Sequence, residues 1–326
     1  MKLLNKKIKG KVVLAPMAGF TSSGYRKFYK KFGVSFSYTE MVSDMGLIYQ
    51  NKETIEYLKQ DKKDNPCGLQ LFGHESEKLV SALKIALKIN PNFAFVDVNM
   101  ACPVNKVTTN GNGSSLLKNP SLIKEIIRNL KANTTLPISI KIRLGIDDNN
   151  INYLEVIKAA EEAGVDFIAL HARTKKQLYS GKPKYELISG LRSQMKVPLI
   201  ISGDIFTVED AINAINITGA DFVMVARGGL GNPLLIKEIN YYFKHKKIKH
   251  YKRSFTRQKR YCLDLAKCLI KEKGETKAMM IYRAIAPKFF NGFENSKKLR
   301  TSLANSLVNY KSLKKILDDY KNGKLI

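Results

Sequence analysis

Cys102 has a residue type and a position that could do chemistry. It follows a strand-like run, with Asn99 three residues before it and Pro103 directly after it, which favours an extended backbone. An ordinary cysteine thiol is largely protonated at neutral pH, so it is better placed to donate a proton than to attack a substrate. A lone cysteine in a loop is also often a small buried residue, and the residues alone leave both interpretations open.

Lys141 and Arg143 are a second candidate pair. They stand two apart in one strand-like run, so their side chains are expected on the same face. Two buried cations side by side are costly unless an anion neutralises them. A bound anionic ligand is one explanation, and an ion pair with an acid from a neighbouring strand is the alternative.

Glycine-rich loops follow two later strand-like runs, and both have the composition of a phosphate site. Ser202, Gly203 and Asp204 follow one run, and Ala226 and Arg227 precede two further glycines after the other. Such loops bind phosphate through backbone N–H groups, and a guanidinium adds a planar fork. The alternative is that the glycines only permit tight turns.

His171 and Arg173 end another such run, but a single histidine decides nothing. No grouping of His, Asp, Glu or Cys has metal-site spacing, so no metal is expected. Cys67, Cys262 and Cys268 fall in apolar patterns and are interpreted as core residues. The cysteine pattern favours the cytoplasm, and the absence of a long apolar run argues against a membrane protein.

The elements that must position these residues alternate between strand-like and helix-like segments. This alternation predicts a parallel α/β fold, and eight runs match a (β/α)₈ TIM barrel. In such a barrel, the candidate residues at the carboxyl ends of the strands gather over one mouth. The eight strand-like runs are 11–16, 34–40, 67–72, 93–99, 137–143, 166–171, 197–202 and 221–226.

The charge distribution divides the chain near residue 240. Residues 241–326 carry 23 bases and 6 acids, or +17 of the total of +28, and their apolar residues have helical spacing. We therefore expect a barrel domain over 1–240 and a small basic all-α helical bundle over 241–326. The stretch 241–260 has nine bases, no acid and interleaved aromatics, which favours nucleic-acid binding over a solvated lysine-rich linker.

Several segments together resemble the tRNA-dihydrouridine synthase family over nearly the whole chain. The most specific is DVNMACPVNKVTTNGNGSSLL (97–117), which combines the N-x-x-C-P turn with a later G-x-G-S segment. The others are LAPMAGFTSSGYR (14–26), TEMVS (39–43), LQLFG (69–73), KIRLG (141–145), LHARTKKQLYSG (170–181), SGDI (202–205) and GADFVMVARGGLGNP (219–233).

The resemblance implies an FMN-dependent reductase that saturates the C5–C6 bond of selected tRNA uridines, with NADPH re-reducing the flavin. It implies Cys102 as the general acid at C5, with Asn99, Arg143 and Arg173 binding the substrate. The residues expected to bind FMN are Pro16, Met17, Ala18, Gln70, Lys141 and His171 at the ring, and Ser202, Gly203, Asp204, Ala226 and Arg227 at the phosphate.

The basic bundle would then bind the tRNA that presents an extruded uridine, and a monomer is expected. The chain departs from the family pattern at Ala101, Ala172 and Ala226, where glycine is usual, and at Ser202, where asparagine is frequent. Two rival hypotheses are a flavin reductase of a free pyrimidine or other small molecule and a non-catalytic RNA-binding protein on the same fold.

Overall fold

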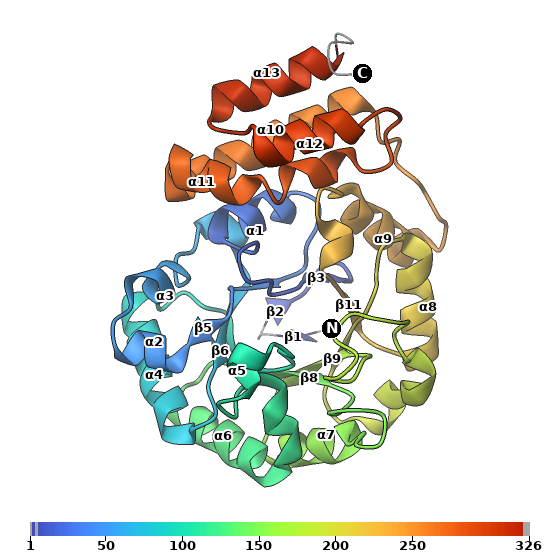
Figure 1. Ribbon diagram of the computed structural model, residues 1–326. Helices are drawn as coiled ribbons and strands as arrows, with labels where there is room; N and C mark the ends of the chain where they lie inside the picture. Colours follow the sequence, from blue (N-terminus) through green and yellow to red (C-terminus); the bar gives the residue numbers. More distant parts are fainter. Residues whose placement is uncertain (1, 4–5, 322–326) are drawn as a thin grey trace.

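The computed structural model describes residues 2–3 and 6–321, and a closed parallel β-barrel fills its centre (Figure 1). Each strand pairs in parallel with its neighbours around the ring, which confirms the predicted TIM barrel. The strands are β3 (Val12–Leu14), β4 (Ser37–Tyr38), β5 (Val42–Ser43), β6 (Cys67–Phe72), β7 (Phe95–Met100), β8 (Ile138–Arg143), β9 (Phe167–His171), β10 (Leu199–Ser202) and β11 (Phe222–Val225).

The second position of the barrel is shared by two short strands. β4 pairs with both β3 and β6 and so closes the ring, and β5 pairs with β6 further along. The intervening residues 39–41 leave the regular ladder. One of them, Glu40, lies close to the site described below.

Helices surround the barrel, as the alternating pattern predicts (Figure 1). Local signals fix their ends: Thr207 and Asp210 form a reciprocal capping box, and Asn119 caps a helix that starts with Pro120. The surrounding helices are α1 (Ser23–Lys30), α2 (Asp44–Ile48), α3 (Lys52–Glu56), α4 (Ser76–Ile89), α6 (Pro120–Asn133), α7 (Tyr153–Glu162), α8 (Val208–Thr218) and α9 (Leu234–His245). The short α5 (Asn105–Thr108) follows β7 and is not part of this outer ring in Figure 1.

Between β9 and β10 the described chain forms two 3₁₀ turns in place of an α-helix, at Tyr185–Ile188 and Leu191–Gln194. Gly190 precedes the second turn in the left-handed region, with φ of 62°. The segment before these turns, 172–184, is a long loop, and its Tyr179 lies at the barrel mouth.

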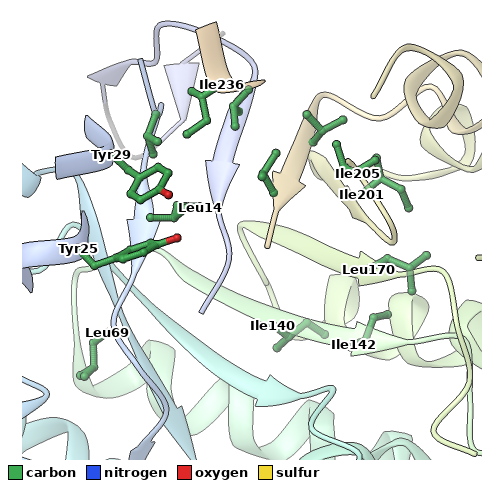
Figure 2. Packing of buried hydrophobic residues seen from close by; sticks show 14 of the residues in the cluster. Leu14, Tyr25, Tyr29, Leu69, Ile140, Ile142, Leu170, Ile201, Ile205 and Ile236 are labelled. Atoms are coloured by element: carbon green, nitrogen blue, oxygen red, sulfur yellow. The ribbon is translucent and has the colours of Figure 1, made fainter. Parts of the chain in front are cut away.

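Alternation along each strand separates two cores. Val96, Ile140 and Leu170 face outward and pack under the helices, in the cluster that Figure 2 shows in part. Inside the barrel, Phe36, Phe95, Phe167 and Phe222 pack edge to face, with ring centroids 5.1 to 5.9 Å apart. These rings fill the amino-terminal half of the barrel interior, so any ligand site must lie at the carboxyl end.

Above the aromatic rings the inward-facing residues become polar. Gln70, Asp97 and Ser139 are register partners on β6, β7 and β8 and form one layer. Asn99 pairs with Lys141 in the next layer up, as expected for inward-facing positions two residues further along each strand. This polar layer lies below the mouth.

A bundle of four helices packs on one side of the barrel, against α1 (Figure 1). Its helices are α10 (Phe255–Lys273), α11 (Glu275–Tyr282), α12 (Lys297–Asn305) and α13 (Tyr310–Lys321), with a 3₁₀ turn at Ala286–Phe290. The expected boundary at residue 240 falls inside α9, which crosses it. The bundle begins only at α10.

The barrel and the bundle are in close contact. Glu272 on α10 accepts hydrogen bonds from Oγ of Ser22 and the backbone N–H of Gly24, both at 2.7 Å. Tyr261 packs edge to face on Phe28 and Phe32 of α1. A short hairpin that the sequence patterns did not predict, β1 (Lys2–Leu3) with β2 (Lys6–Lys7), precedes the barrel. No helix in the described part of the chain is long and apolar enough to span a bilayer.

Candidate active site

A cavity of about 490 Å³ opens at the carboxyl ends of the barrel strands. Its walls come from loops far apart in the sequence, as the barrel prediction requires. Most of the predicted site residues meet there. Those that line the cavity are Pro16, Met17, Ala18, Asn99, Cys102, Lys141, Arg143, His171, Ser202, Gly203, Asp204, Ala226 and Arg227.

Gln70 and Arg173 do not line the cavity. Both are fully buried, Gln70 in the polar layer below the cavity and Arg173 behind the loop that follows β9. Their positions at or near the carboxyl ends of strands predicted both at the mouth. Gln70 forms hydrogen bonds with Asp97 and Asn99. Arg173 donates to loop carbonyls and to Asp204, while its Nη1 has no partner among the described residues.

The backbone around Cys102 is held from both sides. Its N–H donates to Oδ1 of Asn99 at 2.9 Å, and its carbonyl accepts from the N–H and the hydroxyl of Ser114 at 3.0 and 2.9 Å. Gly113 allows this close approach, because a Cβ there would lie 2.8 Å from the Cys102 carbonyl oxygen. The thiol thus sits on a fixed turn at the cavity wall.

Lys141 and His171 line the cavity, and the described part of the chain gives the ammonium of Lys141 and Nε2 of His171 no partner. Lys141 is buried and makes no ion pair with any described residue, although Asp97 lies near enough to act on it through its charge. Burial, together with the charge of Arg143, lowers the pKa of Lys141 to about 8. The structural ion-pair explanation for Lys141 therefore does not hold.

Nε2 of His171 is buried and has no hydrogen-bond partner among the described residues. Burial, with added repulsion from Lys141 and Arg143, holds the pKa of His171 well below its usual range. The ring is therefore neutral at pH 7. It can donate one hydrogen bond and accept one, and it adds no charge to the cavity.

The two arginines near the mouth both bind backbone carbonyls of the 174–181 loop. Arg143 donates to the carbonyls of Thr174 and Leu178 at 2.8 and 3.0 Å, and Arg173 donates to those of Ser180 and Gly181 at 3.1 and 2.5 Å. Arg143 nevertheless lines the cavity, which Arg173 does not. These charged hydrogen bonds fix the loop over the mouth.

Asp204 joins two of the predicted site arginines. It accepts from Arg173 and, at 2.6 Å, from Arg227. Burial opposes its ionisation, but the hydrogen bonds and charges of the two arginines outweigh burial and hold the pKa of Asp204 below its usual value. An anion bound at this wall would therefore face an Arg227 guanidinium that is already paired with the Asp204 carboxylate.

The glycines of the two predicted phosphate loops are needed for packing between the loops. A Cβ at Gly228 would lie 1.9 Å from the carbonyl oxygen of Ile205, and one at Gly203 would lie 2.9 Å from Pro183. Gly203 also has φ of 137°, in the region that favours glycine. The tight-turn explanation therefore accounts for these two residues without a ligand.

Several cavity residues were missed by sequence reasoning. Tyr179 lies half exposed at the mouth, with the Arg227 guanidinium 4.7 Å from its ring centroid, and the same guanidinium lies 5.7 Å from the ring centroid of Phe206. Lys288 reaches the cavity from the bundle. The two aromatic residues could have been found from their loops, since both follow predicted strands. Nothing in the sequence places Lys288 there.

Sequence reasoning also missed Glu40, which holds the loop after β3 that carries Met17 and Ala18. Its Oε2 accepts from the backbone N–H of Gly19 at 2.6 Å, next to Met17 and Ala18 in the cavity wall. Burial raises its pKa despite this hydrogen bond. The residue ends one of the strand-like runs, which is the signal that could have identified it.

The departures from the family pattern fall at different depths. Ala101 and Ala226 line the cavity, while Ala172 is fully buried outside it. Ser202 lines the cavity and donates to the carbonyl of Leu170 at 3.3 Å. Among the described residues, no three His, Cys, Asp or Glu side chains gather as metal ligands.

Comparison with known proteins identifies the family of this chain. A family model described as dihydrouridine synthase matches residues 13–322. A probable tRNA-dihydrouridine synthase 1 of Synechocystis is 36% identical over 72% of this chain, and the match spans just under two thirds, 65%, of that protein. A probable tRNA-dihydrouridine synthase of Rickettsia bellii is 30% identical over 92% of this chain and 91% of its own length.

A solved structure, histamine dehydrogenase from Rhizobium sp. 4-9, resembles this chain with a TM-score of 0.56. It covers 84% of this chain and 49% of its own, at 14% identity. At that identity the likeness shows the fold alone.

Proposed function

Because the chain belongs to the dihydrouridine synthase family, we propose that it reduces the C5–C6 double bond of specific uridines in tRNA. The observation that carries the proposal is the placement of Cys102 on the wall of a cavity that also holds Lys141 and His171. A proton donor and two polar groups without partners in the described part of the chain thus face one cavity. A reductase of this kind needs both.

The residues present fit a flavin, for which FMN is the proposed form. Nε2 of His171 and the ammonium of Lys141 lie at the cavity without a partner among the described residues, which suits the polar edge of an isoalloxazine ring. Pro16, Met17 and Ala18 offer an apolar wall for its face. When bound, the flavin supplies hydride to C6 of the uracil, and NADPH is the proposed source of its electrons.

Cys102 would supply the proton. As hydride reaches C6, the electron pair of the double bond moves toward C5, and the Sγ–H bond breaks to protonate C5. The resulting thiolate recovers a proton from water, since Cys102 is not fully buried. Asn99 has one amide N–H left after its contact with Gln70, and that donor suits a uracil carbonyl.

The phosphate of FMN would lie against the loops after β10 and β11. Arg227 and the backbone near Ser202 and Gly203 line that side of the cavity. Since Asp204 shares its charge between two arginines, Arg227 is already oriented before any phosphate arrives. Orientation in advance reduces the entropy lost on binding.

The bundle is the proposed tRNA-binding part of the chain. It contributes Lys288 to the cavity mouth, and its net positive charge attracts phosphates. A uridine stacked inside folded tRNA must be extruded to reach a cavity at the end of a barrel. Contacts to phosphates on both sides of the mouth would hold the extruded nucleotide.

The test is Cys102→Ala assayed with an unmodified tRNA transcript. We expect flavin content and tRNA affinity to be retained while dihydrouridine formation falls by roughly 10²-fold, the scale for loss of a general acid. Free uridine is the matched substrate control. Full activity on free uridine with none on tRNA would support the rival small-molecule reductase, and an unchanged dihydrouridine yield in the variant would refute the role of Cys102.

A further inference from the structure

A continuous line of hydrogen bonds runs below the cavity from β7 through β6 to the Cys102 turn. Nε2 of Gln70 donates to Oδ2 of Asp97 at 2.7 Å, and Nδ2 of Asn99 donates to Oε1 of Gln70 at 3.0 Å. Oδ1 of Asn99 then accepts from the backbone N–H groups of Ala101 and Cys102, at 3.2 and 2.9 Å.

The chemistry at the two ends fixes the direction of this line. An ionised carboxylate only accepts, so Asp97 must face the nitrogen of the Gln70 amide. Backbone N–H groups only donate, so the Cys102 turn must face the oxygen of the Asn99 amide. The two amides between them then meet nitrogen to oxygen, as observed. Neither amide can turn over without opposing two donors or two acceptors.

From this arrangement we propose that Asp97 is a positioning residue, which sets the Cys102 turn through the amides of Gln70 and Asn99. The inference rests on the proposed role of Cys102 as proton donor. Asp97 touches neither the cavity nor the thiol and acts only through the two amides. The line therefore links the barrel interior to the geometry of proton transfer.

The surroundings of Asp97 support this assignment. Burial raises the pKa of Asp97 to about 6, although Ser139 and Gln70 donate to it, so it remains mostly ionised and an acceptor at neutral pH. It makes no ion pair with Lys141, the nearby buried cation. Its two oxygens are instead used by Ser139, at 2.6 Å, and by Gln70. The carboxylate thus serves the hydrogen-bond network and leaves Lys141 available to the cavity.

A double-variant cycle tests the proposal. Asp97→Leu removes the terminal acceptor, and Gln70→Met cuts the line one residue closer to Cys102 with little change in volume. Each is expected to lower the turnover number on tRNA about tenfold, and the double variant to be no worse than either alone, because both break one path. In Asp97→Leu, flavin content and the KM for tRNA should stay at the level of the unchanged protein, and the turnover of all variants is expressed per bound flavin.

Two matched variants separate positioning from general damage to the core. In Asp97→Asn, the amide oxygen can still accept from Gln70 while the amide NH2 group faces the Ser139 hydroxyl, so turnover should stay within about twofold. Ser139→Ala alters the same carboxylate on the side away from Cys102 and should also stay within about twofold. Neither change interrupts the line to the Cys102 turn.

A second measurement does not depend on turnover. In flavin-free protein, iodoacetamide should modify Cys102 about threefold faster or more in the leucine and methionine variants, because the released turn exposes the thiol more often. Mass analysis of the Cys102 peptide distinguishes it from Cys268. The asparagine and alanine variants should react at the original rate.

Several results would overturn the inference. Effects of Asp97→Leu and Gln70→Met that multiply to about a hundredfold would mean independent roles. An asparagine variant as slow as the leucine variant would show that the charge is needed and not the acceptor. Loss of folding in both cut variants would assign the line to stability. A last outcome is that Cys102→Ala loses activity while Asp97→Leu and Gln70→Met change neither the turnover on tRNA nor the rate of iodoacetamide modification. In that case only this inference fails, and the proposed function stands.

Discussion

Nε of Arg143 donates a 2.8 Å hydrogen bond to the carbonyl oxygen of Ala101, the residue before Cys102. Since the same guanidinium also binds two carbonyls of the 174–181 loop, one side chain joins two loops of the cavity mouth. Burial lowers the pKa of Arg143 to about 10, which still leaves it charged at neutral pH. The side chain is thus part of the cavity wall and also a support for it.

Arg143→Lys should therefore impair the enzyme although it keeps the charge. An ammonium is a compact donor without the planar fork, so it can hold one of these carbonyls but not both loops together. We expect dihydrouridine formation to fall by about tenfold or more, with a lower melting temperature, as for loss of charged hydrogen bonds. Steady-state kinetics and thermal unfolding measure the two effects. Unchanged values in both would show that the charge of residue 143 suffices.

Flavin binding should weaken at alkaline pH through Lys141. Its pKa in the flavin-free protein is lowered to about 8, so the ammonium is present below pH 8 and lost above it. If an electron-rich or anionic flavin edge needs that charge, binding takes up a proton. The dissociation constant should rise about tenfold between pH 7 and pH 9. Quenching of flavin fluorescence on titration into flavin-free protein gives this constant.

Lys141→Met is the control for this pH dependence. It should bind flavin more weakly at pH 7, and its affinity should be nearly flat across the same interval, because the titrating group is gone. A pH slope that persists in the methionine variant would assign the effect to another group.

The limits of sequence reasoning can be traced to particular residues. Alternation put Lys141 and Arg143 on one face, and both line the cavity, whereas Gln70 and Arg173, predicted at the mouth from their place along the strands, do not line it. Alternation gives a direction and not a partner. Only the folded chain shows that Gln70 forms hydrogen bonds with Asp97 and Asn99, and that Arg173 donates to loop carbonyls and to Asp204.

Charge composition has a similar limit. The basic stretch 241–260 begins in α9, and Lys244 lines, with Lys11, a separate hollow at the amino-terminal end of the barrel, away from the cavity. Further along, Arg253 and Arg257 donate to the carbonyls of Phe289 and Lys252. The count of bases predicted an RNA-binding region, but the length and direction of α9 decide which bases can reach the mouth.

Gly228→Ala should loosen the loops at the proposed phosphate site. Its new Cβ would lie 1.9 Å from the Ile205 carbonyl oxygen, so the loop after β11 must move away from the loop after β10. We expect a loss of about 1–3 kcal/mol in the free energy of unfolding, together with reduced flavin content. Denaturant unfolding and flavin absorbance measure these.

The neighbouring Gly229→Ala is the matched control for that prediction. Its Cβ would lie 3.1 Å from a methyl group of Val225 and 3.9 Å from the ring of Tyr29, so a small side-chain adjustment accommodates it. Its stability should change by less than about 1 kcal/mol. Equal effects in the two variants would mean that contact with Ile205 is not the cause.

Removal of charge at the cavity mouth should weaken tRNA binding, whereas removal at the opposite end should not. Lys288 lines the mouth, and Lys252 is exposed beside Arg253, which binds the carbonyl of Phe289 next to Lys288. The double change Lys252→Gln with Lys288→Gln should raise the dissociation constant for tRNA. It should also reduce the slope of log affinity against log salt by about 0.7–0.9 for each phosphate that the protein no longer neutralises.

Lys9→Gln with Lys244→Gln removes the same charge at the amino-terminal end of the barrel, where both residues are exposed. The net charge of the two double variants is equal, so non-specific attraction to a polyanion falls equally in both. Filter binding of one tRNA transcript between about 50 and 200 mM salt compares them, a range over which phosphate neutralisation dominates the change in affinity. If the pair at the amino-terminal end weakens binding as much as the pair at the mouth, the tRNA is attracted by overall charge, and the assignment of the mouth as its binding face is wrong.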